Sequence, residues 1–591
     1  MAYDDVILRM GEFGKYQRRI YLLLCLPAIS CAFHKLAGVF LGAKMNTRCI
    51  LPYENPDNAS YALPTDVMNA SYPWDEETNG WSQCATKTAL DIALNLTRLN
   101  VSGIEDDNGN EFTSEIAKKP LHQETVPCKS YVFDTSVYHS TTTSEWNLVC
   151  DRLWLRATGD SLFMVGVMLG SMIFGGLSDK YGRRPIFFLS LVIQLVGGIL
   201  VAVTPEYISY VIFRLIVGST TSGVFLVAYV IALEMVGPSK RLVAGVGCQL
   251  FFTTGYILTA AFAALIKDWR MLQIAITVPS FVFLVYWWII PESARWLLTK
   301  GRTEEAKDIL HKASKENGVE IPRDSLETLL SDNTDGETAP DIRKPSLLDL
   351  FRYPNLRRKS MLLFFNWLVN SGTYYGLSWN ASNLGGNDYV NFVISGVVEV
   401  PAYTFLIFTL DRWGRKTILC GCMLVSGVAL LATLFVPPGM PWLVVTLAMI
   451  GKLAITSSYG AIYIFTAEQF PTVVRNVGLG ASSTFARIGG VIAPYINHLS
   501  EIWTPFPLVI FGTCALIGGV VSLLLPETLN KKLPESIQDG ELFGKKESSI
   551  EKEKRKRRRQ QQHLDEQLNE IESIKPLKPQ ENGVHDRKQN G

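Results

Sequence analysis

The sequence is poor in charge, and its acidic and basic residues nearly cancel. Only 19% of its 591 residues are Asp, Glu, Lys or Arg, and the formal net charge is +1. Such a balance excludes a protein that binds nucleic acid through bulk positive charge. Ten cysteines are too few for a disulfide-dense secreted scaffold. The chain also lacks HExxH, GxSxG, CxxC and P-loop patterns, so we expect no enzymatic activity, metal centre or bound cofactor.

Apolar residues, by contrast, are abundant and gathered into long runs. They make up 48% of the chain, and a helix of about 20 mostly apolar residues crosses the hydrocarbon core of a bilayer. Twelve such runs alternate with Gly, Pro and charged turns, which predicts an all-α polytopic membrane protein. The predicted spans lie near residues 20–42, 153–176, 185–204, 207–233, 242–266, 271–290, 360–380, 387–410, 416–436, 441–467, 476–498 and 506–525.

Basic residues in the short loops predict the orientation. Arg183 and Arg184 follow the second span, and Arg415 and Lys416 follow the eighth, whereas the alternate loops carry little charge. Loops rich in Lys and Arg stay in the cytoplasm, so we predict that both termini are cytoplasmic. The predicted order is a cytoplasmic N-terminus (1–19), the first span (20–42), an extracellular loop (43–151), spans two to six (152–290), a cytoplasmic loop (291–358), spans seven to twelve (359–525) and a cytoplasmic basic tail (526–591).

The long segment 43–151 carries independent signs of an extracellular position. N-glycosylation and disulfide formation both belong to the secretory, oxidising side of a membrane. The segment has four Asn-X-Ser/Thr sequons and four cysteines, and four cysteines allow three pairings that sequence does not distinguish. The sequons are at Asn58, Asn69, Asn95 and Asn100, and the cysteines are Cys49, Cys84, Cys128 and Cys150. In the tail, the basic run Lys554–Arg559 is interpreted either as solvated chain or as a contact for anionic lipid.

Three motifs recur in the two halves of the chain, in the same order and at nearly constant spacing. Asp179-Lys-Tyr-Gly-Arg-Arg184 recurs as Asp411-Arg-Trp-Gly-Arg-Lys416, Glu234-x6-Arg241 as Glu468-x6-Arg475, and Pro291-Glu-Ser293 as Pro526-Glu-Thr528. A repeat of six helices, an even number, makes the two halves parallel about an axis along the membrane normal. The repeat therefore predicts two six-helix bundles that take turns exposing a central cavity to each side.

The charged members of these motifs lie at the predicted cytoplasmic ends of spans. An Asp would pair with an Arg of its own loop or with a helix N-terminus, and each Glu with the same arginines. We interpret them as a cytoplasmic latch that closes only in the outward-open state; the alternative is a static tie between helices. The predicted gating residues are Asp179, Arg183, Arg184, Glu234, Arg241, Asp411, Arg415, Glu468 and Arg475.

Several of these segments resemble a known family. Residues 175–184, GGLSDKYGRR, are similar to the signature loop of the major facilitator superfamily. The segments SEWNLVCD (144–151), VGPSKR (236–241), PESARWL (291–297), YYGLS (374–378) and AEQFPT (467–472) resemble the organic cation, anion and carnitine transporter family, over residues 12–539. The resemblance implies the major facilitator fold and transport of small organic cations and carnitine-like zwitterions across the plasma membrane by alternating access. Sodium or a proton is the candidate coupling ion.

Charged groups inside membrane spans are costly, so each is a candidate site residue. Arg487 stands where the resemblance implies an acid in cation-selective members and an arginine in anion and carnitine members. It would offer a fork to a carboxylate, or form a structural pair with Glu399. Glu399 would attract an ammonium group or neutralise Arg487 or Lys452. Lys452 would be a second anion contact, or would extend toward the outer interface.

Aromatic rings supply the other part of a predicted organic-ion site, because ring faces attract ammonium groups. Trp367 and Tyr374 are seven residues apart and share one helix face, and the resemblance implies that Phe225 and Phe252 line the cavity. Gln249 would hydrogen-bond the ligand, and Ser483 would share the pocket of Arg487. In the first half, Arg214 is interpreted as a packing and gating residue. His34 and Lys35 are unusual in an apolar span, and His34 is either a proton-sensitive group or a satisfied core histidine.

An arginine for a carboxylate, with rings and an acid for an ammonium, favours a zwitterion over a bare cation. A net-neutral zwitterion gains nothing from the membrane potential, so its accumulation requires a co-transported ion or an exchange partner. The alternatives are a pure cation carrier, an organic anion exchanger, and a receptor or adhesion protein that acts through residues 43–151.

Overall fold

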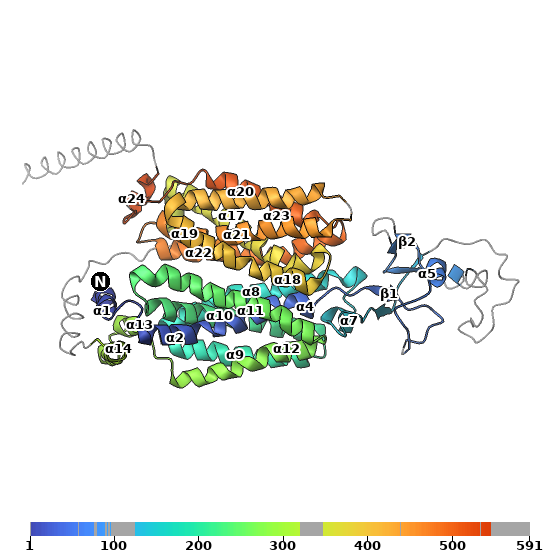
Figure 1. Cartoon of the computed structure of the whole chain (residues 1–591), viewed down its shortest axis with the longest axis horizontal. Helices are drawn as coiled ribbons and strands as arrows, with labels where there is room; N and C mark the ends of the chain where they lie inside the picture. The colour runs from blue at the N-terminus through green and yellow to red at the C-terminus, as the bar shows by residue number, and fades with distance from the viewer. Residues whose placement is uncertain are drawn as a thin grey trace, which may run out of the picture.

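The computed structural model describes residues 2–56, 58–75, 80–88, 91–92, 95, 125–319, 347–437, 439–531 and 533–544. Two helical bundles lie side by side in it, the first drawn in blue to green and the second in yellow to orange (Figure 1). The first bundle contains α2 (Lys15–Cys25), α3 (Pro27–Leu36), α4 (Gly38–Leu41), α8 (Trp154–Tyr181), α9 (Arg183–Val203), α10 (Tyr207–Glu234), η3 (Pro238–Lys240), α11 (Arg241–Leu265), α12 (Trp269–Thr277) and the 3₁₀ helix η4 (Val278–Trp288).

The second bundle repeats this arrangement. It contains α17 (Pro354–Asn380), η5 (Ala381–Leu384), α18 (Asp388–Val397), α19 (Glu399–Trp413), α20 (Arg415–Ala432), η6 (Thr433–Phe435), α21 (Pro441–Gln469), α22 (Arg475–His498), η7 (Leu499–Glu501) and α23 (Phe506–Ser522). In each bundle a long helix that follows a duplicated Gly begins at an arginine, α9 at Arg183 and α20 at Arg415. The predicted repeat is thus visible in the order of the helices.

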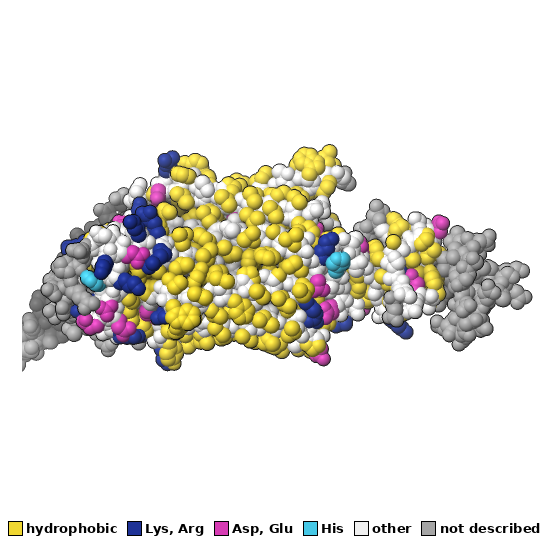
Figure 2. Space-filling view, turned by 60° about the horizontal axis from the view of Figure 1, so that its bottom comes forward, with side chains coloured by type: hydrophobic (Ala, Val, Ile, Leu, Met, Phe, Trp, Pro, Cys, Tyr) yellow, Lys and Arg dark blue, Asp and Glu magenta, His cyan; other side chains and the backbone are white. Residues whose placement is uncertain are grey.

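A broad band of hydrophobic side chains covers the middle of the molecule, and charged side chains gather at both of its ends (Figure 2). Within the described residues, nine helical segments are long and apolar enough to cross a membrane. The three other predicted spans fall on α17 and α22, which are long but more polar, and on α23, which is apolar but has only 17 residues. The count of twelve spans and the side of the termini stay predictions.

Prolines divide three of the predicted spans into shorter helices. Pro27 begins α3 directly after α2, Pro279 lies at the start of η4, and Pro401 lies in the first turn of α19. Proline has no N–H to donate, so each removes one rung of the helical hydrogen-bond ladder. The break before α19 places Glu399 at the first position of that helix, deep in the molecule.

Short helices lie at the end of the bundles that carries the duplicated motifs, which we call the motif end (Figure 1). They are α1 (Ala2–Arg9), α13 (Ala294–Thr299), α14 (Thr303–Asn317), α16 (Leu347–Arg352) and α24 (Ile537–Leu542). α1 is attached to the first bundle, because Tyr3 donates to the Glu234 carbonyl at 2.9 Å and Asp4 pairs with Arg241 at 2.6 Å. α24 is attached to the second bundle through Glu541, which accepts from the backbone N–H of Leu356 at 3.0 Å.

The described residues between 43 and 151 project from the opposite end, which we call the loop end (Figure 1). They form three two-stranded antiparallel ribbons, two short α-helices and the 3₁₀ helix η2 (Cys150–Arg152). The ribbons pair β1 (Thr47–Cys49) with β6 (Tyr131–Phe133), β2 (Trp74–Asp75) with β3 (Gly80–Trp81), and β4 (Ala85–Lys87) with β5 (Thr125–Pro127); the helices are α5 (Thr65–Ser71) and α7 (Thr142–Glu145).

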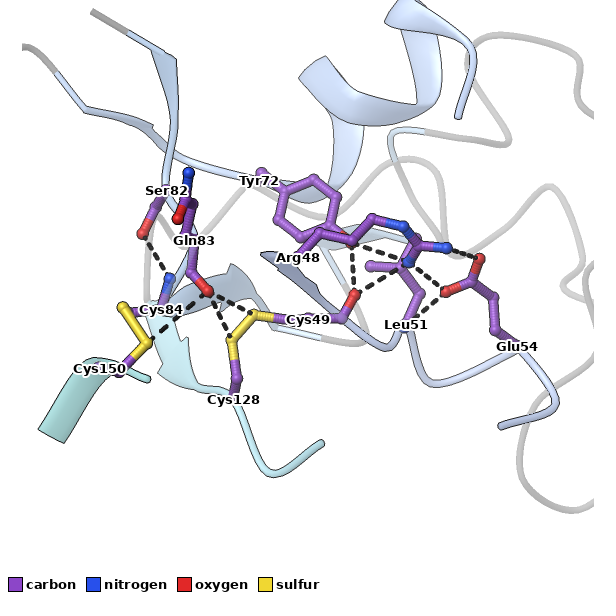
Figure 3. The surroundings of a disulfide bond; sticks show 10 residues. All are labelled: Arg48, Cys49, Leu51, Glu54, Tyr72, Ser82, Gln83, Cys84, Cys128 and Cys150. Atoms are coloured by element: carbon purple, nitrogen blue, oxygen red, sulfur yellow. Dashed lines mark hydrogen bonds and ion pairs between the residues drawn. A yellow bond between two sulfur atoms is a disulfide. The ribbon is translucent and has the colours of Figure 1, made fainter. Parts of the chain in front are cut away.

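The four cysteines of this segment form two disulfides beside the ribbons (Figure 3). Of the three possible pairings, the structure has Cys49 with Cys128 and Cys84 with Cys150. Among the predicted glycosylation residues, Asn58 and Asn69 are exposed, and Asn95 is half-buried and donates from Nδ2 to the Ala70 carbonyl at 3.1 Å. Asn100 and the basic run Lys554–Arg559 lie outside the described residues.

Candidate functional site

A fully buried ion pair lies between the bundles, near the middle of the helices. Lys452 of α21 lies 3.3 Å from Glu399 of α19, and their side chains are 1% and 0% exposed. The carboxylate also accepts from the Tyr374 hydroxyl at 2.6 Å and from the Thr253 hydroxyl of α11 at 2.8 Å. Since Thr253 belongs to the first bundle and the others to the second, this cluster joins the two halves.

The Lys452 ammonium makes further contacts besides the one with Glu399. Its ammonium donates to the Tyr374 carbonyl at 3.3 Å and to the Ser378 hydroxyl, and it stands 3.5 Å from the centroid of the Tyr374 ring. Lys452 therefore does not extend toward an outer interface. Of the partners expected for Glu399, the structure contains Lys452 and not Arg487.

Arg487 of α22 remains without a carboxylate partner among the described residues. Its guanidinium donates to the Ser483 carbonyl at 2.7 Å and to the Ser483 hydroxyl, one turn earlier on the same helix, and no residue that the structure describes accepts from its buried Nε. The side chain is half-buried. Lys35, Tyr375, Tyr459 and Tyr463 all lie within range of its charge.

Aromatic rings surround these charged groups. Trp367 donates from its indole N–H to Thr466 at 2.8 Å, and its ring lies 4.4 Å from Tyr463 and 6.1 Å from Tyr459. Tyr374 stacks on the same Tyr459 at 5.5 Å, so Trp367 and Tyr374 do share a face. The residues of this aromatic group that come from the second bundle are Trp367, Tyr374, Tyr375, Tyr459 and Tyr463.

The first bundle contributes two more rings and a second cation. Phe225 of α10 and Phe252 of α11 meet edge to face at 6.0 Å. The Lys35 ammonium of α3 stands 5.9 Å from the Phe252 ring and 4.5 Å from the Tyr375 ring. Gln249, one turn before Phe252, is half-buried, and no described side chain hydrogen-bonds it. The structure thus brings the predicted site residues into one region between the bundles, which we call the central region.

At the loop end the two bundles are in direct contact. Lys44 pairs with Glu501 at 2.8 Å, and the Tyr138 hydroxyl donates to Asp388 at 3.0 Å. Phe40 stacks on Tyr389 at 5.5 Å. A pocket beside these contacts is lined by residues of both bundles, including Arg156, Asp160, Asn497, His498 and Glu501. The structure is therefore closed across the bundles at its loop end.

Two buried residues of the first bundle, Arg214 and His34, lie close to these contacts at the loop end. Arg214 is 1% exposed, pairs with Asp160 at 3.4 Å and donates to the His34 carbonyl at 3.2 Å, so it packs α10 against α8 and α3. No described residue hydrogen-bonds the two buried ring nitrogens of His34. Among the described residues, His34 therefore lacks the partners that a satisfied core histidine would have.

At the motif end, the first-half charged residues form one cluster. Arg183 pairs with Asp179 one turn before it and with Glu234 at 3.4 Å, and Glu234 also accepts from the Ser293 hydroxyl at 2.6 Å. Glu292 accepts from the backbone N–H groups of Arg183 and Arg184 at 3.0 and 3.2 Å, at the start of α9. Burial raises the pKa of the Glu292 carboxyl above its ordinary value, and backbone N–H groups of Ser293, Arg184 and Arg183 oppose this rise.

The second half repeats this cluster residue by residue. Arg415 pairs with Asp411 at 2.8 Å and with Glu468 at 3.2 Å, and Glu468 accepts from the Thr528 hydroxyl at 2.5 Å. Glu527 accepts from the backbone N–H groups of Arg415 and Lys416, both at 3.1 Å. A carboxylate at a helix N-terminus satisfies donors that have no partner within the helix, so Glu292 and Glu527 fasten the duplicated loops.

The predicted latch differs from what the structure contains. In each cluster the pairs join helices of one bundle, and they are formed while the loop ends of the bundles are in contact. They are therefore not confined to an outward-open state, and the static tie describes them better. Three further gating candidates have separate contacts: Arg184 lies over the Trp287 ring, Arg241 pairs with Asp4, and Arg475 donates to Thr472 at 3.3 Å.

Sequence reasoning missed several residues of the region. Tyr459 and Tyr463 lie seven and eleven residues after Lys452, a spacing that places all three on one face of α21. This spacing could have identified the two tyrosines from the sequence. Thr253 and Ser378 carried no such signal, because their roles depend on how α11 and α17 cross the second bundle. Glu292 and Glu527 were visible in the repeat, but their function as helix caps was not.

Comparisons of the chain with a family model, with curated proteins and with solved structures agree with one another. The family model described as "Sugar (and other) transporter" matches residues 125–539. The organic cation transporter protein of Drosophila melanogaster is 60% identical over 550 residues, which is 92% of this chain and 96% of that protein. The beta-alanine transporter of the same organism is 34% identical over 92% of this chain and 89% of its own length. The inward open structure of the xylose transporter XylE from E. coli has a TM-score of 0.50 and 18% identity, over 66% of this chain and 89% of that one, and shows the shared fold.

Proposed function

Since the chain belongs to the sugar (and other) transporter family of the major facilitator superfamily, and to the organic cation transporters within it, we propose that its substrates are small organic cations and carnitine-like zwitterions. That the protein is a multi-pass membrane transporter of small organic ions, and not an enzyme, follows from the family. The substrate class within the organic ions is the part that we propose.

The observation that carries the proposal is Arg487. It is a half-buried guanidinium in the central region, free of any described carboxylate and surrounded by aromatic rings. A guanidinium matches a carboxylate in geometry and charge, and the ring faces of Tyr459, Tyr463 and Phe252 would receive an ammonium group. Beta-alanine, which the name of one relative gives as its substrate, is itself a zwitterion, and this supports the proposal.

The orientation that we propose for the protein rests on the two ends of the molecule. We propose that the loop end faces the cell exterior, because sequons and disulfides belong there, and that the motif end faces the cytoplasm of a plasma-membrane protein. The two bundles would rock about the central region by alternating access, with the contacts Lys44–Glu501 and Tyr138–Asp388 breaking when the loop end opens. Sodium or a proton would couple the transport of a net-neutral substrate.

Uptake of radiolabelled carnitine, tetraethylammonium and hippurate by expressing cells, with and without sodium, tests the proposal. We expect Arg487→Ala to lower carnitine uptake about 10- to 100-fold, the range lost with a hydrogen-bonded charged partner, at unchanged surface abundance. Arg9→Ala is the matched control, because Arg9 is exposed on α1 and lies outside the duplicated motifs. Wild-type cells that accumulate neither carnitine nor tetraethylammonium would refute the substrate class, and normal carnitine uptake by Arg487→Ala would remove Arg487 from the site.

A further inference from the structure

Lys35 is a second cation in the central region, and the proposed function does not use it. It belongs to α3, in the first bundle, whereas Arg487 belongs to α22 in the second. Its ammonium lies over the Tyr375 ring at 4.5 Å and near the Phe252 ring at 5.9 Å. Arg487 stands three residues before Gly490 on α22, where a Cβ would lie 3.5 Å from the Tyr375 ring, and its charge acts on both Lys35 and Tyr375, so two positive groups from opposite bundles lie near the same ring.

Two other buried cations within the helices have an acid as partner. Lys452 is paired with Glu399, and Arg214 with Asp160. For Lys35 and Arg487, no carboxylate of the described residues is in ion-pair contact, and Glu399 is already engaged by Lys452, Tyr374 and Thr253. A charge in a membrane span is costly unless it is paired or reaches water. Two such charges in proximity therefore leave a place for an anion that the chain itself does not fill.

We propose that Lys35 and Arg487 together form a clamp for the carboxylate of the substrate, and that Lys35 makes the protein favour carboxylate-bearing substrates over bare cations. The proposal rests on the proposed function and narrows it. A carboxylate between the two groups receives charge-assisted hydrogen bonds from both bundles, and its negative charge relieves their mutual repulsion. A bare cation brings no such relief and meets two like charges, so the favoured substrates are carboxylate-bearing organic ions with an apolar or ammonium-bearing body.

The clamp also links binding to the movement of the bundles. One of its members lies in each bundle, so a carboxylate held by both favours the state in which α3 and α22 approach. A ligand shifts a conformational equilibrium only by its differential affinity for the two states. Carnitine should therefore change the conformation more than tetraethylammonium does at equal occupancy.

The test uses the full chain in expressing cells, with uptake normalised to surface abundance. The variants are Lys35→Gln, which removes the charge, and Lys35→Arg, which keeps it; Lys15→Gln, at an exposed lysine of α2, is the matched control. We expect Lys35→Gln to lower carnitine and hippurate uptake about 10- to 100-fold and to leave tetraethylammonium uptake unchanged or higher. Lys35→Arg should retain most carnitine uptake, which a merely structural role would not explain.

The outcomes separate this inference from the proposed function. If wild-type cells take up carnitine and the Lys35→Gln variant takes it up equally well, the clamp is overturned while the proposed function stands. An equal loss of carnitine and tetraethylammonium uptake in Lys35→Gln would also overturn it, because a packing defect does not distinguish the two probes. Wild-type cells that take up none of the probes would overturn the proposed function, and the clamp with it.

Discussion

The buried pair of Glu399 and Lys452 can be broken from either side, and the two single changes should cost far more than the double change. Lys452→Met leaves a carboxylate that is 0% exposed with two hydroxyl donors, at 2.6 and 2.8 Å, and no cation. Glu399→Gln leaves an ammonium that is 1% exposed with neutral partners only. Removing one partner of a buried ion pair costs about 3–5 kcal/mol, whereas replacing both by neutral groups is often close to neutral.

The free energy of unfolding of the purified protein, from titration with a denaturing detergent, provides the measurement. We expect each single variant to lose about 3–5 kcal/mol and the double variant to lose less than either, so that its loss falls short of the sum of the two by at least about 3–5 kcal/mol. The exposed pair Arg302 and Glu305, 2.6 Å apart, is the control, and its single changes should stay below about 1 kcal/mol. Additive losses at Glu399 and Lys452, within about 0.5 kcal/mol, would refute the reasoning.

Two further predictions concern the loops. Gly182 has a φ of +116°, and a Cβ there would lie 2.6 Å from Glu292 Oε2. Gly182→Ala should therefore cost about 1–2 kcal/mol of stability or more. The control Gly176→Ala should be neutral or stabilising, because a Cβ at Gly176 would meet no atom within 4 Å. Comparable heat stability of the two variants in detergent would contradict this. Cys84→Ser opens a loop of 66 residues, worth about 4 kcal/mol of unfolded-state entropy, and should lower the surface abundance measured by biotinylation of intact cells. The control Cys422→Ser, at an unpaired cysteine, should not, and an equal abundance of both would argue against a structural role for the disulfide.

Much of the fold could be predicted because its causes lie along the chain. Apolar runs long enough to cross a bilayer mark most helices, and the duplicated motifs mark the two bundles. Asp179 and Arg183 are only four residues apart, on either side of the turn between α8 and α9, and the structure pairs them. The prolines that divide the spans were equally visible, although the position of the breaks depends on which neighbouring groups donate hydrogen bonds to the freed carbonyls.

The central region was less predictable because its contacts join distant helices. From sequence, Glu399 had Arg487 and Lys452 as equal candidates, and the crossing of α19 and α21 decides between them. The disulfide pairing was open for the same reason, since the register of β1 against β6 brings Cys49 toward Cys128. Lys35 stood out as a charge in an apolar span, but only its approach to Tyr375 and Arg487 gave it a role.

The central claim is that one site between two bundles opens to each side in turn, and accessibility from the two sides tests it most directly. In a chain whose six unpaired cysteines are replaced, Ser483→Cys is labelled with a membrane-impermeant thiol reagent after Lys44→Cys and Glu501→Cys are joined by a cleavable crosslinker. We predict that the crosslinked protein is labelled from the motif end only, and that cleavage of the crosslinker restores labelling from the loop end. Labelling from the loop end that persists in the crosslinked protein would contradict the account.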